Sequence, residues 1–108
     1  MEGARRMIVQ TVTFIIKKEG KEIFETKTNK DVTSMLEFTG CISSECWFLE
    51  EKNTCEFMLV SKWKSKKDFQ NWLKRPEHLQ EHREAHKNKE TKPSFVIEKI
   101  RKSYEVSF

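Results

Sequence analysis

The feature that most constrains this chain is the order in which its apolar blocks occur. Four blocks have the β-branched and aromatic content of strands, and segments with helical spacing separate them. The predicted strands span residues 7–16, 41–49, 57–63 and 94–108. The predicted helical segments span residues 21–36, 65–75 and 77–89. The order is therefore strand, helix, strand, strand, helix, strand, with the last two helical segments counted as one divided helix.

The residues around the second predicted helix give the clearest local signals. Ser65 is followed three residues later by Asp68, and a serine hydroxyl with an acid in the first turn is typical of a helix N-terminus. Phe69 and Trp72 are then three residues apart, on one apolar face of that helix. Pro76 falls where the helix must end or bend and where a further helical piece can begin.

The first helical segment has a weaker pattern. Its apolar residues are only loosely spaced at helical intervals, and residues 29–34 are poor helix formers. The sequence therefore predicts a short or broken helix whose apolar positions are Ile23, Phe24, Val32, Met35 and Leu36.

Alternation identifies the final strand. Its apolar residues share one parity, so they are predicted to lie on one face of the strand. They are Val96, Ile100, Tyr104, Val106 and Phe108.

This order of elements is that of a ferredoxin-like fold, an α+β domain with βαββαβ topology and an antiparallel sheet. Helices cover one face of such a four-stranded sheet. The other face needs cover, and a second copy of the chain is the simplest cover. The order therefore predicts a homodimer in which two sheets face each other as a dimeric α/β barrel.

Length and composition limit the kind of protein. At 108 residues the chain holds one domain, residues 1–108, in which residues 1–6 are expected to be a flexible N-terminal extension. An aromatic content of 11% argues against disorder, although 35% of the residues are charged. The formal net charge is +4, but Lys and Glu are interleaved, and the run at 62–67 (KWKSKK) is typical of a solvated face. Since the Gly/Phe signature of RNA-binding sheets is missing, we expect no nucleic-acid partner.

The three cysteines favour a reduced, cytoplasmic protein. Cys41, Cys46 and Cys55 are an odd set without a CxxC pair, which fits neither a disulfide framework nor a zinc ribbon. Cys46 and Cys55 could face each other across a hairpin, although nothing requires a bond there. No apolar run reaches the roughly 20 residues that cross a bilayer, and residues 1–6 lack the apolar stretch of a signal peptide. We therefore expect a soluble cytoplasmic protein without a membrane partner.

The stretch from residue 60 to residue 86, VSKWKSKKDFQNWLKRPEHLQEHREAH, is the most informative part of the sequence. A strand ends in Trp63, a helix carries Phe69 and then Trp72, and His82 follows ten residues after Trp72. This arrangement resembles the antibiotic biosynthesis monooxygenase family, and within it is most similar to the IsdG-type heme-degrading monooxygenases. Many relatives outside that branch carry His where this chain has Trp72.

The resemblance implies a monooxygenase that binds heme, opens the porphyrin ring and releases iron. It makes His82 the axial ligand of the heme iron and Trp72 the residue that presses on the porphyrin and helps to ruffle it. In those enzymes an Asn on the first strand forms a hydrogen bond close to the iron. The matching position here is Thr13, a shorter side chain, and the nearby Gln10 has the opposite strand parity. Because the chain has no flavin or nicotinamide signature, turnover needs an external electron donor.

His82 can also be judged from the residues alone. A lone His on an inward helix face is often a core or interface residue, and the spacing to Trp72 adds the interpretation as a ligand. In a straight helix these two residues are about 15 Å apart, so they can contact one ligand if the ligand is broad, as a porphyrin is, or if Pro76 breaks the helix. His78, His82 and His86 form a ladder at four-residue intervals, but a third ligand type for zinc is missing.

Two other functions remain open. The first is a cofactor-independent monooxygenase of the same family that acts on a quinol or an aromatic polyketide-like substrate. The second is a non-catalytic dimeric module that binds or regulates, which Thr13 in place of Asn favours slightly.

Overall fold

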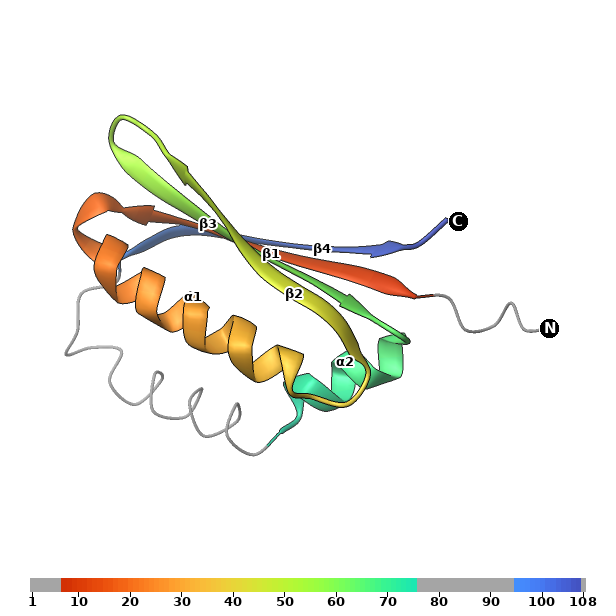
Figure 1. Cartoon of the computed structure of the whole chain (residues 1–108). Helices are drawn as coiled ribbons and strands as arrows, with labels where there is room; N and C mark the ends of the chain where they lie inside the picture. Colours follow the sequence, from red (N-terminus) through yellow and green to blue (C-terminus); the bar gives the residue numbers. More distant parts are fainter. Residues whose placement is uncertain (1–6, 76–94, 108) are drawn as a thin grey trace.

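The computed structural model describes residues 7–75 and 95–107 of the chain, and its elements follow the predicted order (Figure 1). They are β1 (Ile8–Lys17), a 3-10 turn (Lys18–Gly20), α1 (Lys21–Leu36), β2 (Cys41–Glu50), β3 (Thr54–Trp63), α2 (Lys66–Leu73) and β4 (Val96–Glu105). The strands form one sheet in the order β2-β3-β1-β4, and every neighbouring pair is antiparallel. The ferredoxin-like α+β prediction is confirmed. The predicted helical piece at 77–89 lies outside the described residues.

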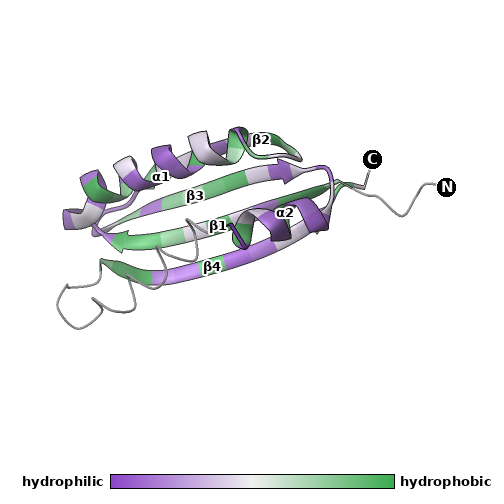
Figure 2. Cartoon of the chain, turned by 90° about the horizontal axis from the view of Figure 1, so that it is seen from below, coloured by the Kyte–Doolittle hydropathy of each residue, from purple (hydrophilic) through white to green (hydrophobic). Residues whose placement is uncertain are grey.

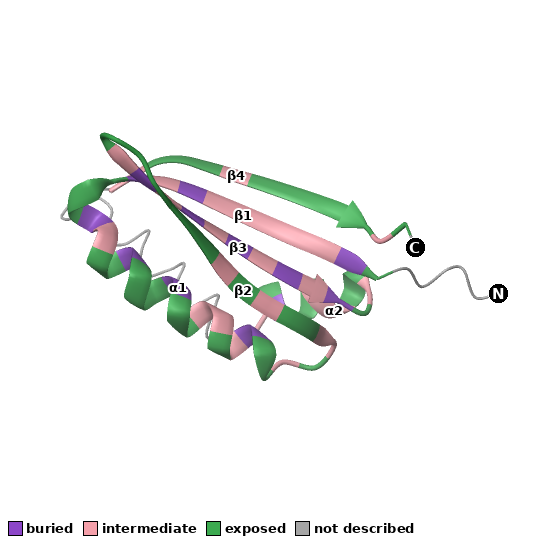
Figure 3. Ribbon diagram, turned by 45° about the horizontal axis from the view of Figure 1, so that its top comes forward, coloured by how far each residue is buried: buried purple, intermediate pink, exposed green. Residues whose placement is uncertain are grey.

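Both described helices lie on the same face of the sheet (Figure 1). Strand β3 makes this clear because its burial alternates along its length (Figure 3). The residues of β3 that face the helices are buried: Cys55, Phe57, Leu59, Ser61 and Trp63. We call this side the covered face and the opposite side the open face.

Aromatic side chains fill much of the core between the helices and the covered face. The ring centres of Phe14 and Phe24 are 5.3 Å apart, and those of Trp63 and Phe69 are 5.6 Å apart. Trp63 is fully buried, and its indole N–H donates to the Ser61 hydroxyl at 2.9 Å, so the polar edge of the ring is satisfied. Trp63 is therefore a core residue.

Helix α1 corrects the prediction of a short or broken first helix, because it runs without interruption for 16 residues. Packing against the core explains the difference, because Val32 within the stretch 29–34 packs against the core and Met35 after it is buried. Thr28 is also buried, and its hydroxyl donates to the Phe24 carbonyl at 2.8 Å. This hydrogen bond satisfies a hydroxyl that would otherwise be costly inside the core. Phe24 and Met35 are also buried, whereas Ile23 and Leu36 are exposed.

Two irregular positions change which side chains share a face. Between the pairs Ile15–Glu98 and Ile16–Val96 the register shifts by one residue on β4. As a result Val96 packs against the core on the covered face, while Ile100, paired with Thr13, lies on the open face. The prediction that they share a face is wrong because this bulge breaks the alternation. A second shift falls between Cys41 and Ser43 on β2.

The described cysteines are all free thiols. Cys46 pairs across the hairpin with Leu59, and Cys55 pairs with Glu50, so the two cysteines do not oppose each other. Within the described ranges, no helix is long and apolar enough to span a bilayer.

The start of α2 follows the predicted capping signal. The Ser65 hydroxyl accepts a hydrogen bond from the Asp68 amide at 3.3 Å, which satisfies one of the free N–H groups at the helix end. Gly40 lies directly against this turn with φ of +91°, and a Cβ there would come 2.3 Å from the Asp68 side chain. Glycine is required at this position by both its conformation and its surroundings.

The open face is broad and largely uncovered in a single chain. Trp47 is 53% exposed and Tyr104 is 50% exposed, and the Trp47 indole donates to Glu45 at the surface. The other side chains that the pairing places on this face include Val9, Thr11, Thr13, Ile15, Leu49, Met58, Val60 and Ile100. This face therefore combines apolar and β-branched residues with flanking charges.

Candidate functional site

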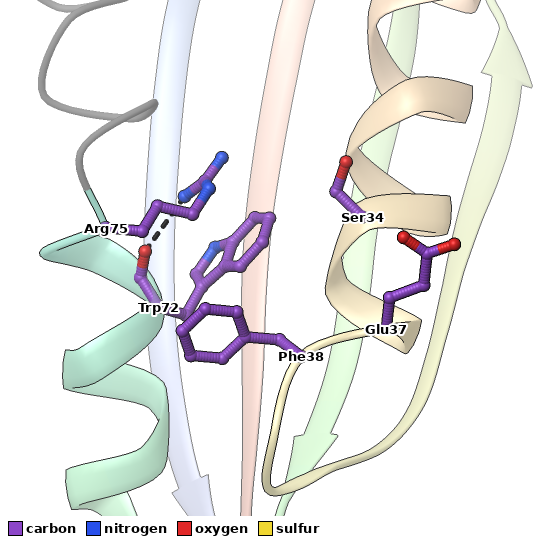
Figure 4. A pocket seen from close by; sticks show the side chains of 5 residues that line it. All are labelled: Ser34, Glu37, Phe38, Trp72 and Arg75. Carbon is purple, nitrogen blue, oxygen red and sulfur yellow. Dashed lines mark hydrogen bonds between the residues drawn. The ribbon is translucent and has the colours of Figure 1, made fainter.

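A small pocket lies between the end of α1 and the end of α2, on the covered face (Figure 4). Its volume is about 220 Å³. Figure 4 shows the side chains of Ser34 from α1, of Glu37 and Phe38 just after this helix, of Trp72 from α2, and of Arg75 just after α2. The pocket thus combines two aromatic rings with a hydroxyl, a carboxylate and a guanidinium.

Trp72 is the centre of this pocket. Capping by Ser65 fixes where α2 begins, and the helical period then turns Trp72 toward the core, where it is 6% exposed. Its ring centre is 5.5 Å from that of Phe38, in an edge-to-face arrangement, and 6.3 Å from that of Trp63. The sequence therefore predicted correctly that Trp72 belongs to an inward-facing aromatic group.

Arg75 covers one face of the Trp72 ring, a contact that the sequence pattern did not indicate. Its guanidinium carbon lies 3.3 Å from the ring centre, within the range of a cation–π interaction. The same side chain donates through Nη1 to the Trp72 carbonyl at 2.9 Å. Arg75 is three residues after Trp72, and this helical spacing is the signal that could have identified the pair.

The structure does not bring Thr13 to Trp72. Thr13 pairs with Met58 and Ile100, whereas the adjacent Phe14 is buried on the covered face. Since neighbouring side chains of a strand point to opposite faces, Thr13 lies on the open face. The expectation that Thr13 lines the same pocket as Trp72 is therefore corrected by the strand's alternation.

Gln10 is the amide-bearing residue of β1 that lies on the covered face. It pairs with Ser61, whose hydroxyl accepts from the Trp63 indole at 2.9 Å, and Trp63 in turn packs against Trp72. The Gln10 amide Nε2 donates to the Ser103 hydroxyl at 2.7 Å. Gln10 thus places an amide on the covered face, which Thr13 does not reach, between the strands that carry Ser61 and Ser103.

The described ionisable groups do not form a nucleophilic or metal centre. Burial raises the pKa of the Cys41 thiol and of the Cys46 thiol, so neither is activated as a thiolate at neutral pH. Within residues 7–75 and 95–107, no group of three or more His, Cys, Asp or Glu could hold a metal ion. His82, the predicted axial ligand, lies outside the described residues together with His78 and His86.

One comparison with known proteins identifies the family of this chain. The family model for antibiotic biosynthesis monooxygenases matches residues 7–87, which is most of the chain and includes Thr13, Trp72 and His82. No curated protein matches the chain.

Solved structures share the same fold at low sequence identity. A candidate antibiotic biosynthesis monooxygenase from Bacillus cereus is 21% identical with a TM-score of 0.68, and the match covers 95% of each chain. One from Nitrosomonas europaea is 16% identical with a TM-score of 0.74, covering 96% of this chain and 93% of that one. One from Deinococcus radiodurans is 12% identical with a TM-score of 0.73, covering 94% and 93%.

Proposed function

Because this chain belongs to the antibiotic biosynthesis monooxygenase family, we propose that it is a heme-degrading monooxygenase that binds its substrate on the covered face of the sheet. The observation that carries the proposal is the position of Trp72, which lines a pocket between the two helices with an aromatic partner and a cation. Such a wall suits a flat, broad aromatic substrate.

Each site residue has a separate task in this proposal. His82 supplies a neutral imidazole nitrogen to the heme iron, a role that suits its basicity. Trp72 packs against the porphyrin and sets its shape. Gln10 replaces Thr13 as the source of a hydrogen-bond donor on the substrate side of β1, since its side chain lies on the covered face. Oxidative opening of the ring uses dioxygen and electrons from an external donor, because the sequence has no flavin or nicotinamide motif.

The side chains that line the pocket suit heme chemically, but the pocket is smaller than a heme requires. A volume of about 220 Å³ is below the roughly 300–1,000 Å³ of common ligand pockets. Arg75 lies on the Trp72 ring, so this side chain must move before a porphyrin can contact the indole. The proposal therefore requires Arg75 to exchange a cation–π contact for a contact with the substrate.

We also propose that the open face pairs with the open face of a second copy. A large exposed apolar patch on a small domain indicates an interaction surface, and here Trp47, Leu49 and Tyr104 are each about half exposed. A two-fold interface places the same patch on both subunits, so a sheet covered on one side can close the other side against itself. This pairing would also bury Thr13 at the interface.

A hemin titration tests the heme assignment. Purified protein is titrated with hemin and followed in the Soret region, first without and then with ascorbate. We expect saturation near one heme per chain, and decay of the band once ascorbate is added. His82→Ala should abolish the Soret shift, whereas His86→Ala, a matched change in the same segment, should leave it. A wild-type protein that shows no saturable shift, or a His82→Ala protein that binds as before, contradicts the assignment.

The size of the pocket favours a second candidate, a cofactor-independent oxygenation of a single-ring quinol. A ring of that size fits about 220 Å³ without displacing Arg75 from Trp72. Oxygen consumption with a panel of quinols and no added heme distinguishes the two functions. Uptake that depends on the quinol and ignores hemin supports the second candidate. Binding of either ligand without turnover, with a reductant present, indicates a non-catalytic module.

A further inference from the structure

Three cationic side chains gather on the covered face, on the other side of the sheet from Thr13 and beyond the Trp72 pocket. Lys99 and Arg101 belong to β4, where they pair with Phe14 and Val12 of the covered face. The Lys99 ammonium is 5.2 Å from the ring centre of Phe14, and the Lys27 ammonium of α1 is 5.5 Å from the same ring centre. Two cations from separate elements therefore flank one buried ring.

Positive charge is in excess in this cluster. Lys27 forms an ion pair with Asp31 at 3.2 Å, and Asp31 also acts on Lys99. Burial, followed by repulsion from Arg101 and Lys27, nonetheless lowers the pKa of Lys99 below its ordinary value, and the attraction of Asp31 does not offset these effects. Among the described residues, Asp31 is the carboxylate that acts on Lys99, and an added anion would relieve the repulsion that Lys99 receives from Arg101 and Lys27.

Edge protection alone does not explain this arrangement. Strand β4 is at the edge of the sheet, and charged side chains that point inward from an edge strand discourage pairing with other chains. Charges of either sign would protect the edge, and they would be needed only on β4. Here the two β4 charges nearest Phe14, Lys99 and Arg101, are both positive, Glu105 lies at the far end of the strand beside Ile8, and Lys27 joins the two cations from α1. Figure 2 shows that most of β4 is hydrophilic, in contrast to the hydrophobic stretches of β1 and β3.

The cluster is aligned with the Trp72 pocket along α1. Lys27 and Ser34 are seven residues apart, so they lie on the same side of the helix, about 10 Å apart along its axis. Ser34 lines the pocket and Lys27 belongs to the cation cluster. A ligand bound against Trp72 and extending along this side of α1 would reach the cations.

We propose that Lys27, Lys99 and Arg101 form an anion subsite that binds a carboxylate of the ligand whose aromatic part contacts Trp72. This proposal rests on the proposed function in one respect, since for heme the carboxylates are those of its propionates. Charge-assisted hydrogen bonds from Lys and Arg to a carboxylate are stronger than neutral ones, and Lys99 would hold its proton more firmly when the carboxylate is bound. The subsite would orient the ligand by its acidic edge.

Matched double variants test the subsite. Lys99→Gln combined with Arg101→Gln removes two charges from the covered face, and Lys62→Gln combined with Lys102→Gln removes two from the open face of the same sheet. The dissociation constants of hemin and of its dimethyl ester are measured for each protein. We expect the covered-face variant to weaken hemin binding at least about tenfold and the ester less than about twofold, whereas the open-face variant changes neither. Equal losses for hemin and ester, or no loss, overturn the subsite.

A second measurement separates this proposal from the assignment of heme. Backbone amide signals of residues 99 and 101 are followed by NMR during titration with phthalate, an aromatic dicarboxylate. Saturable shifts that disappear in the covered-face variant support the subsite, even if the wild-type protein binds no hemin and the heme assignment fails. Shifts that do not saturate, or that persist unchanged in that variant, overturn the subsite even if hemin binds.

Discussion

The two faces of the sheet come from the same four strands, yet they differ in almost every physical respect. On the covered face, Trp63 is fully buried and its indole N–H is satisfied by Ser61. On the open face, Trp47 is 53% exposed and its indole donates to Glu45 at the surface. Strand parity decides which of two tryptophans stabilises the core and which is available to a partner.

The same comparison divides the candidate functional residues. Trp72, Gln10 and the cations near Phe14 share the covered face, while Thr13 lies on the open face. The proposals above accordingly place ligand chemistry on the covered face and association with a second copy on the open face. Four pairs of measurements can test this difference between the two faces.

The largest expected effect is on the core. Trp63→Ala should lower the free energy of unfolding by about 3–5 kcal/mol, because a large buried ring leaves a cavity. Trp47→Ala should act mainly through association, so its cost should change with protein concentration. Urea unfolding at two protein concentrations measures both. If the two variants lose equal stability at every concentration, the two faces do not differ as described.

The next effect concerns the open face. Met58 lies on it between Thr13 and Trp47, and Met58→Glu would place an unpaired charge in the proposed interface. We expect the dimer dissociation constant to rise by about a hundredfold or more, as measured by sedimentation equilibrium. Lys102→Gln, a change in charge nearer the edge of that face, should raise it far less. A wild-type protein that sediments as a monomer contradicts the assignment of this face.

A smaller effect distinguishes Gln10 from Thr13 on β1. Gln10→Leu should slow the ascorbate-dependent decay of the Soret band by roughly fivefold to tenfold, the value of one lost hydrogen bond. Thr13→Val, a change of similar chemistry three residues away, should leave the rate constant unchanged. The opposite ranking would return the distal role to Thr13 and would require ligand on the open face.

The smallest effect is a pH dependence at the end of β2. Lys18 and Lys21 form ion pairs with Glu50 at 3.3 and 3.4 Å and hold the pKa of its carboxyl below the ordinary value. This contribution is present above the pKa of the unfolded chain and is lost as the pH falls through the lower folded value. Glu50→Gln should therefore lower the urea midpoint slightly at pH 7 and not at pH 3. A shift of the same size at both pH values would exclude the ion pairs as its cause. Added salt should also reduce the shift at pH 7.

Much of the fold was predictable from local patterns. Strand-like blocks, the turn residues and the capping signal at Ser65 gave the element order, and the structure confirms it. The first helix was less predictable because residues 29–34 have low helix propensity. Tertiary contacts decide the outcome there, since Val32 packs against the core and the following Met35 is buried.

The candidate site was predictable only in part, because the sequence alone did not show which face of a strand each residue occupies. Trp72 was identified by its spacing, which depends on one helix alone. Thr13 was identified by counting from a glycine, and such a count does not say which face of β1 a side chain occupies. The register shift near Val96 was not predicted for a similar reason. A bulge leaves no clear mark in the alternation of apolar residues, so the sequence does not show where the face changes.

The most direct test of the central claim compares the tryptophans on the two faces. The chain has three tryptophans, and each gives one indole N–H signal in a two-dimensional NMR spectrum, assigned with Trp→Phe variants. Because heme iron is paramagnetic, bound hemin broadens nearby signals. At one equivalent of hemin we predict that the Trp72 signal disappears while the Trp47 signal remains sharp. Loss of the Trp47 signal with Trp72 retained, or no change in either signal, would contradict the placement of the ligand on the covered face.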